Sequence, residues 1–188
     1  GYVGGSDFFG QNRQYTRVIP QDEVPSRDNP ILDPPSSLLE ALKVFFIGVS
    51  AGRIQGWGRD NPNRSMLVHP SRTTLEHFQY FQSIQAVKDQ WSVIFALPDG
   101  DPDKQELVRE FARAHANLAE TVGAELPSFP AILGRLANDI AATQVREINR
   151  RPGNRARDMN WRQAYAWILV GGQAMDRGFT VKELTVTY

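Results

Sequence analysis

Ala166-Trp167-Ile168-Leu169-Val170 is an unbroken apolar segment near the C-terminus, and Gly171-Gly172 follows it directly. A short continuous apolar run of this kind is typical of a strand that is buried on both faces, as strands inside parallel sheets are. The two glycines allow the backbone to turn sharply where the strand ends. Ligands of open α/β sheets bind beyond the carboxyl ends of the strands. We therefore expect functional residues directly after this segment.

Three further segments have the pattern of strands, and segments of helical periodicity lie around and between them. Residues 64–71 read as a short buried strand with a polar end, residues 143–149 alternate, and residues 184–188 are rich in β-branched side chains. Helices are predicted from Ser37, where Ser37 and Glu40 have capping-box spacing, and from Thr73 or Thr74. The pattern predicts an α/β fold with a mostly parallel sheet flanked by helices. Two more helices, from about residue 104 to 122 and after residue 130, predict an all-helical insert at about residues 100–141.

The N-terminal residues 1–36 contain many glycines and prolines and are predicted to form an irregular strap that packs its aromatic side chains on the domain. A loop that approaches a ligand through Gly4-Gly5 is the alternative. Residues 37–188 have the length of one ordinary domain. The chain does not begin with Met and ends on strand-like residues, so we expect it to be a piece of a larger protein.

Composition narrows the function classes. The formal net charge is zero, so no global field would draw the chain onto a membrane or a nucleic acid. The chain has no cysteine, which excludes disulfides and cysteine-based zinc sites and fits a cytoplasmic location. No signal peptide or membrane-spanning segment is evident. The histidines are scattered, and no Asp or Glu has a Lys two positions later, so we expect neither a metal site nor a nuclease centre in this segment.

Two segments could contact nucleic acid. His69, Ser71 and Arg72 lie at a predicted strand-to-helix junction, where a helix N-terminus favours phosphate; a lone His is also commonly structural. Residues 146–162 hold six arginines against two acidic residues, a net charge of +4, and include Arg150, Arg151 and Arg155. This tract is either a solvated loop in an arginine-rich protein or a patch for a nucleic-acid backbone.

Residues 170–181, with Gly171-Gly172 and Arg177-Gly178, resemble the signature of the Z1 (Z-one) domain family of endonucleases. Residues 2–9 and 64–69 match the same family in the same order, so the resemblance covers nearly the whole chain. More distantly, residues 170–181 are similar to motif V of superfamily-two helicases, and residues 66–71 correspond to motif IV. Gly172 stands where helicases usually carry Thr, and Thr180 where they usually carry Asp.

The resemblance implies the second RecA-like lobe of a nucleic-acid-dependent ATPase that binds DNA and acts in antiviral (phage) defence. It implies ATP and Mg²⁺ as cofactors, held mainly by an N-terminal ATPase lobe of the parent protein, because this chain has no phosphate-binding loop with its Lys. The nucleotide-contacting residues implied are Gly172, Asp176, Arg177, Gly178 and Thr180. Arg177 could instead be structural, bridging Asp176 or the chain end.

Three hypotheses follow. The first is an ATPase motor lobe acting on DNA, and it predicts that Arg177 is needed for DNA-stimulated ATP hydrolysis. The second is a nuclease, and it requires that this segment alone cuts nucleic acid in a metal-dependent reaction. The third is a non-catalytic interaction domain in which the helical insert recruits a partner. In each case this segment on its own is expected to be inactive as an ATPase.

Overall fold

The computed structural model describes residues 16–25, 33–56, 63–70, 74–149, 154–155, 158–172 and 181–188. Its long helices are α2 (Ser36–Ile54), α3 (Thr74–Phe95), α4 (Pro102–Val122) and α5 (Phe129–Ala142). Its strands are β1 (Arg64–Val68), β2 (Gln144–Ile148), β3 (Ala166–Gly171) and β4 (Leu184–Thr187). Short 3₁₀ turns occur at η2 (Gln21–Glu23), η3 (Gly123–Glu125) and η5 (Trp161–Gln163). Within these residues, no helix has both the length and the apolar character needed to cross a bilayer.

The strands form one sheet in the order β2-β3-β1-β4, and every pair in it is parallel. Val68 of β1 is level with Val170 of β3, and Ile148 of β2 is level with Gly171. β3 is buried along its whole length, as its apolar sequence predicted. The prediction of an α/β fold with a parallel sheet flanked by helices is therefore confirmed.

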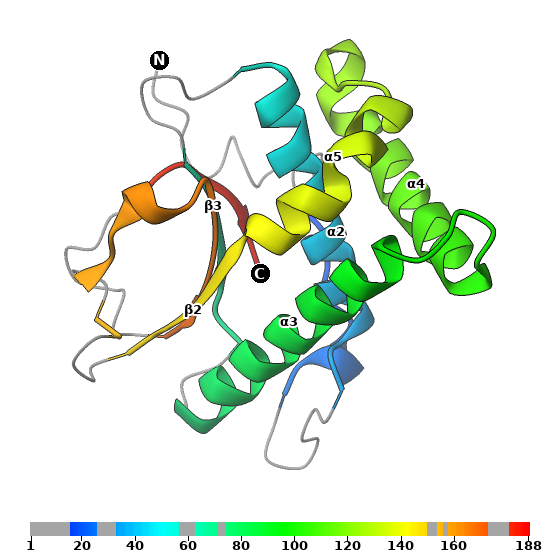
Figure 1. The fold of residues 1–188 in the computed structure, drawn as a ribbon. Coiled ribbons are helices and arrows are strands. Elements are labelled where there is room, and N and C mark those ends of the chain that lie inside the picture. The colour runs from blue at the N-terminus through cyan, green and yellow to red at the C-terminus, as the bar shows by residue number, and fades with distance from the viewer. Residues whose placement is uncertain are drawn as a thin grey trace.

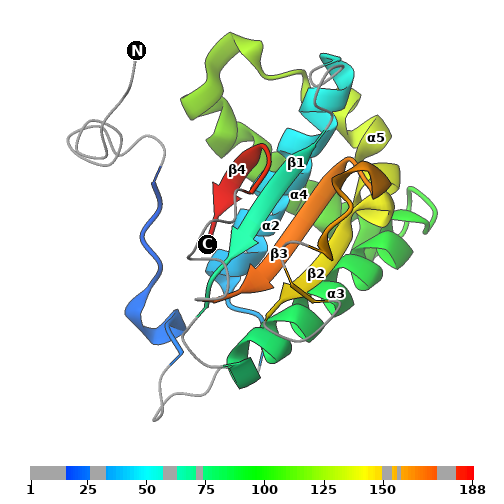
Figure 2. The ribbon, with the colours of Figure 1, turned by 90° about the vertical axis from the view of Figure 1, so that its left-hand side faces the viewer.

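The four long helices cover one face of the sheet, as Figure 1 shows with the sheet edge-on and Figure 2 shows with the sheet in front. The side chains that β1 and β3 direct to this face belong to the main core: Met66, Val68, Ile168 and Val170. The opposite face carries a smaller apolar cluster built on Ile148, Trp167 and Leu169. Residues from the segments after β2 and after β3 pack against it: Met159, Trp161, Ala164 and Val181.

Helices α4 and α5 occupy the region that the sequence predicted to be helical. Asp101 is the N-cap of α4, and its side chain accepts a hydrogen bond of 2.9 Å from Asp103 N. Phe111 of α4 and Leu136 of α5 are fully buried in the same core that contains α2 and α3. Residues of this segment are thus part of the main core of the domain.

The capping box predicted at Ser37 and Glu40 is wrong. α2 begins one residue earlier, at Ser36, and no side chain of its N-cap residue, Pro35, caps it. Glu40 instead pairs with Lys43 at 2.6 Å. The N-terminus of α2 is capped by the carboxylate of Glu23, which comes from the preceding strap and could not be recognised by local spacing.

Candidate functional site

The carboxyl edge of the sheet lies between two helix N-termini. Tyr188 Oη, just after β4, lies 2.8 Å from Ser37 Oγ in the first turn of α2. The ring of His69, just after β1, lies 6.3 Å from that of His77 in the first turn of α3. Both helices therefore start where the parallel strands end, and their N-terminal dipoles raise the potential at this edge.

The elements described next after β1 and after β3 pack on opposite faces of the sheet. After β1 the chain enters α3, which packs on the helical face. After β3 it reaches Val181, which packs with Trp167 and Leu169 on the other face. Because β1 and β3 are neighbours, the position beyond their carboxyl ends is the place where open α/β sheets bind ligands.

The structure brings three of the predicted site residues to this edge. Gly172 is buried directly after β3, and His69 follows β1 at the level of Gly171. Arg155 is held near the end of β2, because Asn149 N donates a hydrogen bond of 2.9 Å to Asn154 O. The other predicted site residues lie outside the described residues: Ser71, Arg72, Arg150, Arg151, Asp176, Arg177, Gly178 and Thr180.

His69 is exposed, whereas His77 beside it is buried. The backbone N–H of His69 donates a hydrogen bond of 2.8 Å to Tyr188 O and continues the pairing of β1 with the segment of β4. That N–H is consequently occupied within the sheet, so the exposed imidazole is the part of His69 that a ligand could contact.

An anionic side chain already occupies the N-terminus of α2. One carboxylate oxygen of Glu23 accepts a hydrogen bond from Ser36 Oγ, and the other accepts one of 2.9 Å from Ser37 N. These hydrogen bonds, with that from Ser36 the strongest, hold the pKa of the Glu23 carboxyl below its usual value. A second anion at this helix end would meet the Glu23 charge.

Tyr80 of α3 adds to the polar character of the β4 side of the edge. Its side chain is buried, and its hydroxyl has no hydrogen-bond partner among the described residues. Burial, reinforced by Tyr188, Glu76 and Glu23, raises the pKa of Tyr80 to about 12. The β4 side thus already carries the negative charge of Glu23, whereas the side formed by β1, β3 and β2 carries His69, Gly172 and Arg155.

Sequence reasoning missed Glu23, Tyr80 and Tyr188. Glu23 lies 13 and 14 residues before the serines that it contacts, and Tyr188 contacts a serine 151 residues away. A carboxylate shortly before a helix that begins Ser-Ser is the one local signal that could have identified the cap. Among the described residues, no group of three or more His, Asp or Glu side chains could hold a metal ion.

Comparison with known proteins gives one match. The family model described as the Z1 domain matches residues 37–188. No curated protein and no solved structure matches the chain.

Proposed function

The chain belongs to the Z1 domain family, and on this basis we propose that it is the second motor lobe of a nucleic-acid-dependent, helicase-like ATPase. In this proposal the parent protein acts on DNA in the cytoplasm, in defence against phage. A first lobe with a phosphate-binding loop holds ATP and Mg²⁺. This chain closes on the nucleotide from its carboxyl edge and binds the nucleic acid.

The observation that carries the proposal is that β1 and β3 are neighbouring parallel strands whose carboxyl ends lie side by side. Helix α3, which follows β1, packs on one face of the sheet, and Val181, the first described residue after Gly172, packs on the other. Gly171-Gly172 ends one strand, and His69 follows the other. A strand that ends in two glycines lets a ligand approach the backbone closely, because no side chain stands in the way.

The distribution of charge at the edge supports one orientation of the ligand. Glu23 already neutralises the N-terminus of α2, so the phosphates lie nearer the start of α3 and the end of β3. There the chain offers the Gly172 backbone and, by the sequence resemblance, Arg177. ATP supplies the phosphoryl group that is cleaved. The part of Arg177 is to stabilise negative charge that increases on the phosphate oxygens.

The proposal does not include a metal-dependent nuclease centre among the described residues of this chain. Magnesium nucleases need clustered carboxylates, and the described residues provide no group of three metal-binding side chains. The proposal therefore assigns any cutting residues of the family to another segment of the parent protein.

The test uses the natural protein that carries this chain. Changing Arg177→Ala is expected to abolish DNA-stimulated ATP hydrolysis while the melting temperature stays within about 2 °C, which would show that the fold is retained. The matched control is Arg113→Ala, because Arg113 lies exposed on α4 and pairs with Glu106. Unchanged hydrolysis in a folded Arg177→Ala protein would refute the assignment of Arg177.

A further inference from the structure

A second group of charged side chains lies at the opposite, amino edge of the sheet, where α2 ends and β1 begins. Asp139 of α5 is buried, and its carboxylate accepts a hydrogen bond of 2.9 Å from Ser50 Oγ. The same carboxylate lies 3.1 Å from Arg53 Nε and 3.4 Å from Arg135 Nε. One buried acid thus positions two arginines from different helices.

Both arginines meet Asp139 through Nε, the guanidinium nitrogen nearest the backbone. Each guanidinium also carries two terminal amino groups, which can donate bidentate hydrogen bonds to a phosphate. The Arg53 guanidinium is further fixed by the ring of Tyr165, whose centre lies 4.3 Å from Arg53 Cζ. The side chains of Arg53 and Arg135 are 35 % and 42 % exposed, so a ligand can reach them.

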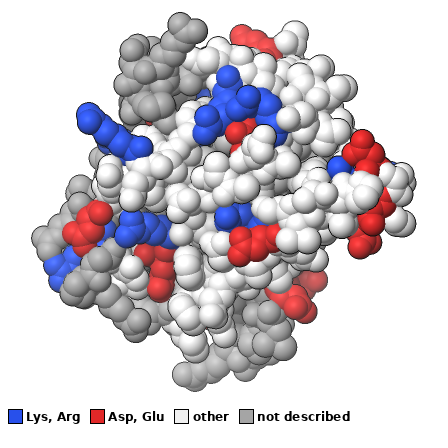
Figure 3. Space-filling view, viewed as in Figure 1, with Lys and Arg blue, Asp and Glu red and all other residues white. Residues whose placement is uncertain are grey.

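Positive charge exceeds negative charge around this group. Arg64, the first residue of β1, also approaches it, since its Nε would lie 3.0 Å from a Cβ added at Gly52. Arg53 and Arg135 carry two positive charges against the single charge of Asp139, which leaves +1 for this group. Figure 3 shows Lys and Arg atoms gathered over the C-terminal end of α2 and over α5, with only a small red area among them.

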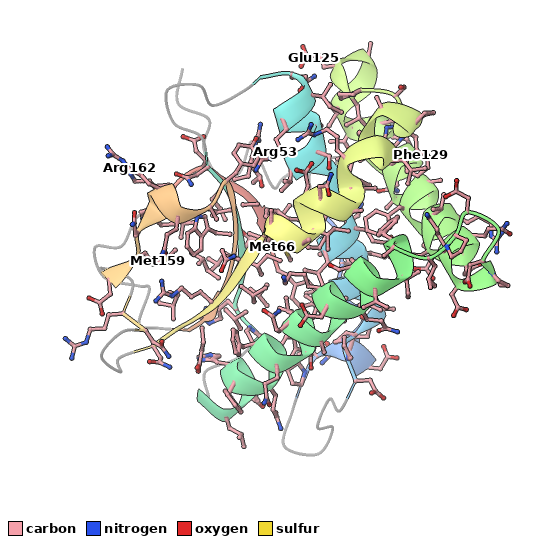
Figure 4. All side chains as sticks on the ribbon, viewed as in Figure 1. Arg53, Met66, Glu125, Phe129, Met159 and Arg162 are labelled. Carbon is pink, nitrogen blue, oxygen red and sulfur yellow. The ribbon has the colours of Figure 1, made fainter. Side chains whose placement is uncertain are left out.

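Further basic and acidic residues on this face can be located in Figure 4. Arg162 of η5 is exposed and lies on the opposite side of the sheet from Arg53, and both side chains are visible in the view of Figure 4. Glu125 lies beyond the end of α2, where its backbone carbonyl accepts a hydrogen bond from Gln55 Nε2, and its side chain extends away from Arg53. The face therefore presents separated arginines along one side of the molecule.

We propose that Arg53 and Arg135 bind phosphate groups of a nucleic-acid backbone at the amino edge of the sheet. This inference rests on the proposed function, because it names a surface through which the motor lobe holds its nucleic acid. The arginines are oriented before binding by Asp139 and Tyr165, so little side-chain entropy is lost when a phosphate arrives. A polymer suits the site better than a free anion, because partly exposed arginines hold one small anion weakly but hold several linked phosphates together.

The experiment measures binding of a fluorescent single-stranded DNA oligonucleotide to the chain by anisotropy, over a series of NaCl concentrations. The variants are Arg53→Gln and Arg135→Gln, with Arg113→Gln on α4 as the matched control. Each lost phosphate contact is expected to weaken binding at low salt and to reduce the slope of log K against log[salt] by about 0.7. The control is expected to keep the wild-type slope.

Arg135→Lys guards against loss of the fold, since it keeps the charge beside Asp139. This variant is expected to retain the slope of log K against log[salt] and to lose part of the affinity, because an ammonium group cannot bind phosphate in a bidentate manner. Inorganic phosphate, added at constant ionic strength, is expected not to displace the oligonucleotide; displacement would assign the arginines to a free anion and overturn the proposal.

The remaining outcomes separate this inference from the proposed function. Oligonucleotide binding with an unchanged slope in folded Arg53→Gln and Arg135→Gln variants would refute the amino-edge surface and leave the motor-lobe proposal standing. A chain that binds no oligonucleotide at any salt concentration would overturn both.

Discussion

A methyl group added to α2 at one position should disturb the amino edge, and the same group added one turn earlier should not. At Gly52 a Cβ would lie 2.6 Å from Tyr165 Oη and 3.0 Å from Arg64 Nε, whereas at Gly48 it meets nothing within 4 Å. Both glycines lie in the helix, so each Gly→Ala change gains up to about 1 kcal/mol of helix propensity. The difference between the two variants therefore isolates the collision.

Overpacking of this kind costs about 1–3 kcal/mol. We expect Gly48→Ala to raise the free energy of unfolding by about 0.5–1 kcal/mol. Gly52→Ala should lie about 1–3 kcal/mol below it. Urea unfolding, followed by the fluorescence of the buried Trp91 and Trp167, measures both values.

A double-mutant cycle identifies the colliding atom. Tyr165 Oη is buried and has no hydrogen-bond partner among the described residues, so Tyr165→Phe alone should be close to neutral. In the Tyr165→Phe background, Gly52→Ala should recover most of its loss, which is a coupling on the order of 1 kcal/mol. Equal effects of Gly48→Ala and Gly52→Ala, with no coupling to Tyr165, would contradict the packing of Tyr165 against Gly52. The position of Arg53 over the Tyr165 ring would be contradicted as well.

Three further predictions concern the buried and capping groups. Glu23→Gln should lower the free energy of unfolding by about 1 kcal/mol at neutral pH, because it removes the charge that caps α2. Since the pKa of Glu23 is lowered in the folded state, the stability that its charge contributes is present above the ordinary carboxyl pKa. This stability should vanish as pH falls through the lower folded pKa, which acid unfolding curves would reveal. Tyr80 has a raised folded pKa of about 12, so the stability that its neutral phenol contributes is complete below the ordinary pKa of 10.0 and is lost as pH rises from there. In alkaline unfolding, the Tyr80→Phe variant should therefore lose less stability than the wild type. An identical loss in the two proteins would count against burial of this phenol. Asp139→Ala should cost about 2–3 kcal/mol in urea unfolding, because Ser50 loses its acceptor and two arginines lose their shared partner, whereas a change below the experimental error would argue that Asp139 is solvated.

Strands and helices were predictable because local patterns specify them. The apolar residues of β3 indicated a strand buried on both faces, and helical periodicity from about residue 104 to 122 indicated α4, which begins at Pro102. The glycines after β3 also located one wall of the candidate site. The strand order was not predictable, because it depends on crossover connections that single segments do not encode.

Contacts between distant segments account for what sequence reasoning missed. Glu23 replaced the predicted capping box at Ser37, since a neighbouring strap can deliver a carboxylate as well as the helix can. Ser50 and Asp139 are 89 residues apart, so their hydrogen bond leaves no sequence pattern. The spacing of Arg135 and Asp139, four residues apart on one helix, was the one available signal of the amino-edge group.

The structure also changes how the interaction-domain hypothesis should be tested. Deleting residues 100–141 would remove Phe111 and Leu136 from the main core, so loss of a partner could follow from unfolding alone. Substitution of exposed residues in this segment, such as Arg109 and Arg113, is the appropriate test, because surface changes usually leave stability within about 0.5 kcal/mol.

The central claim is that anionic ligands bind where β1 and β3 end. Amide chemical shifts of the isotopically labelled chain, recorded during titration with ATP, test it most directly. The account predicts shift changes at His69, Gly171 and Gly172, with the amide of Phe111 in the core of α4 unmoved. Shift changes that saturate with ATP elsewhere in the chain, while those three amides stay unmoved, would contradict it.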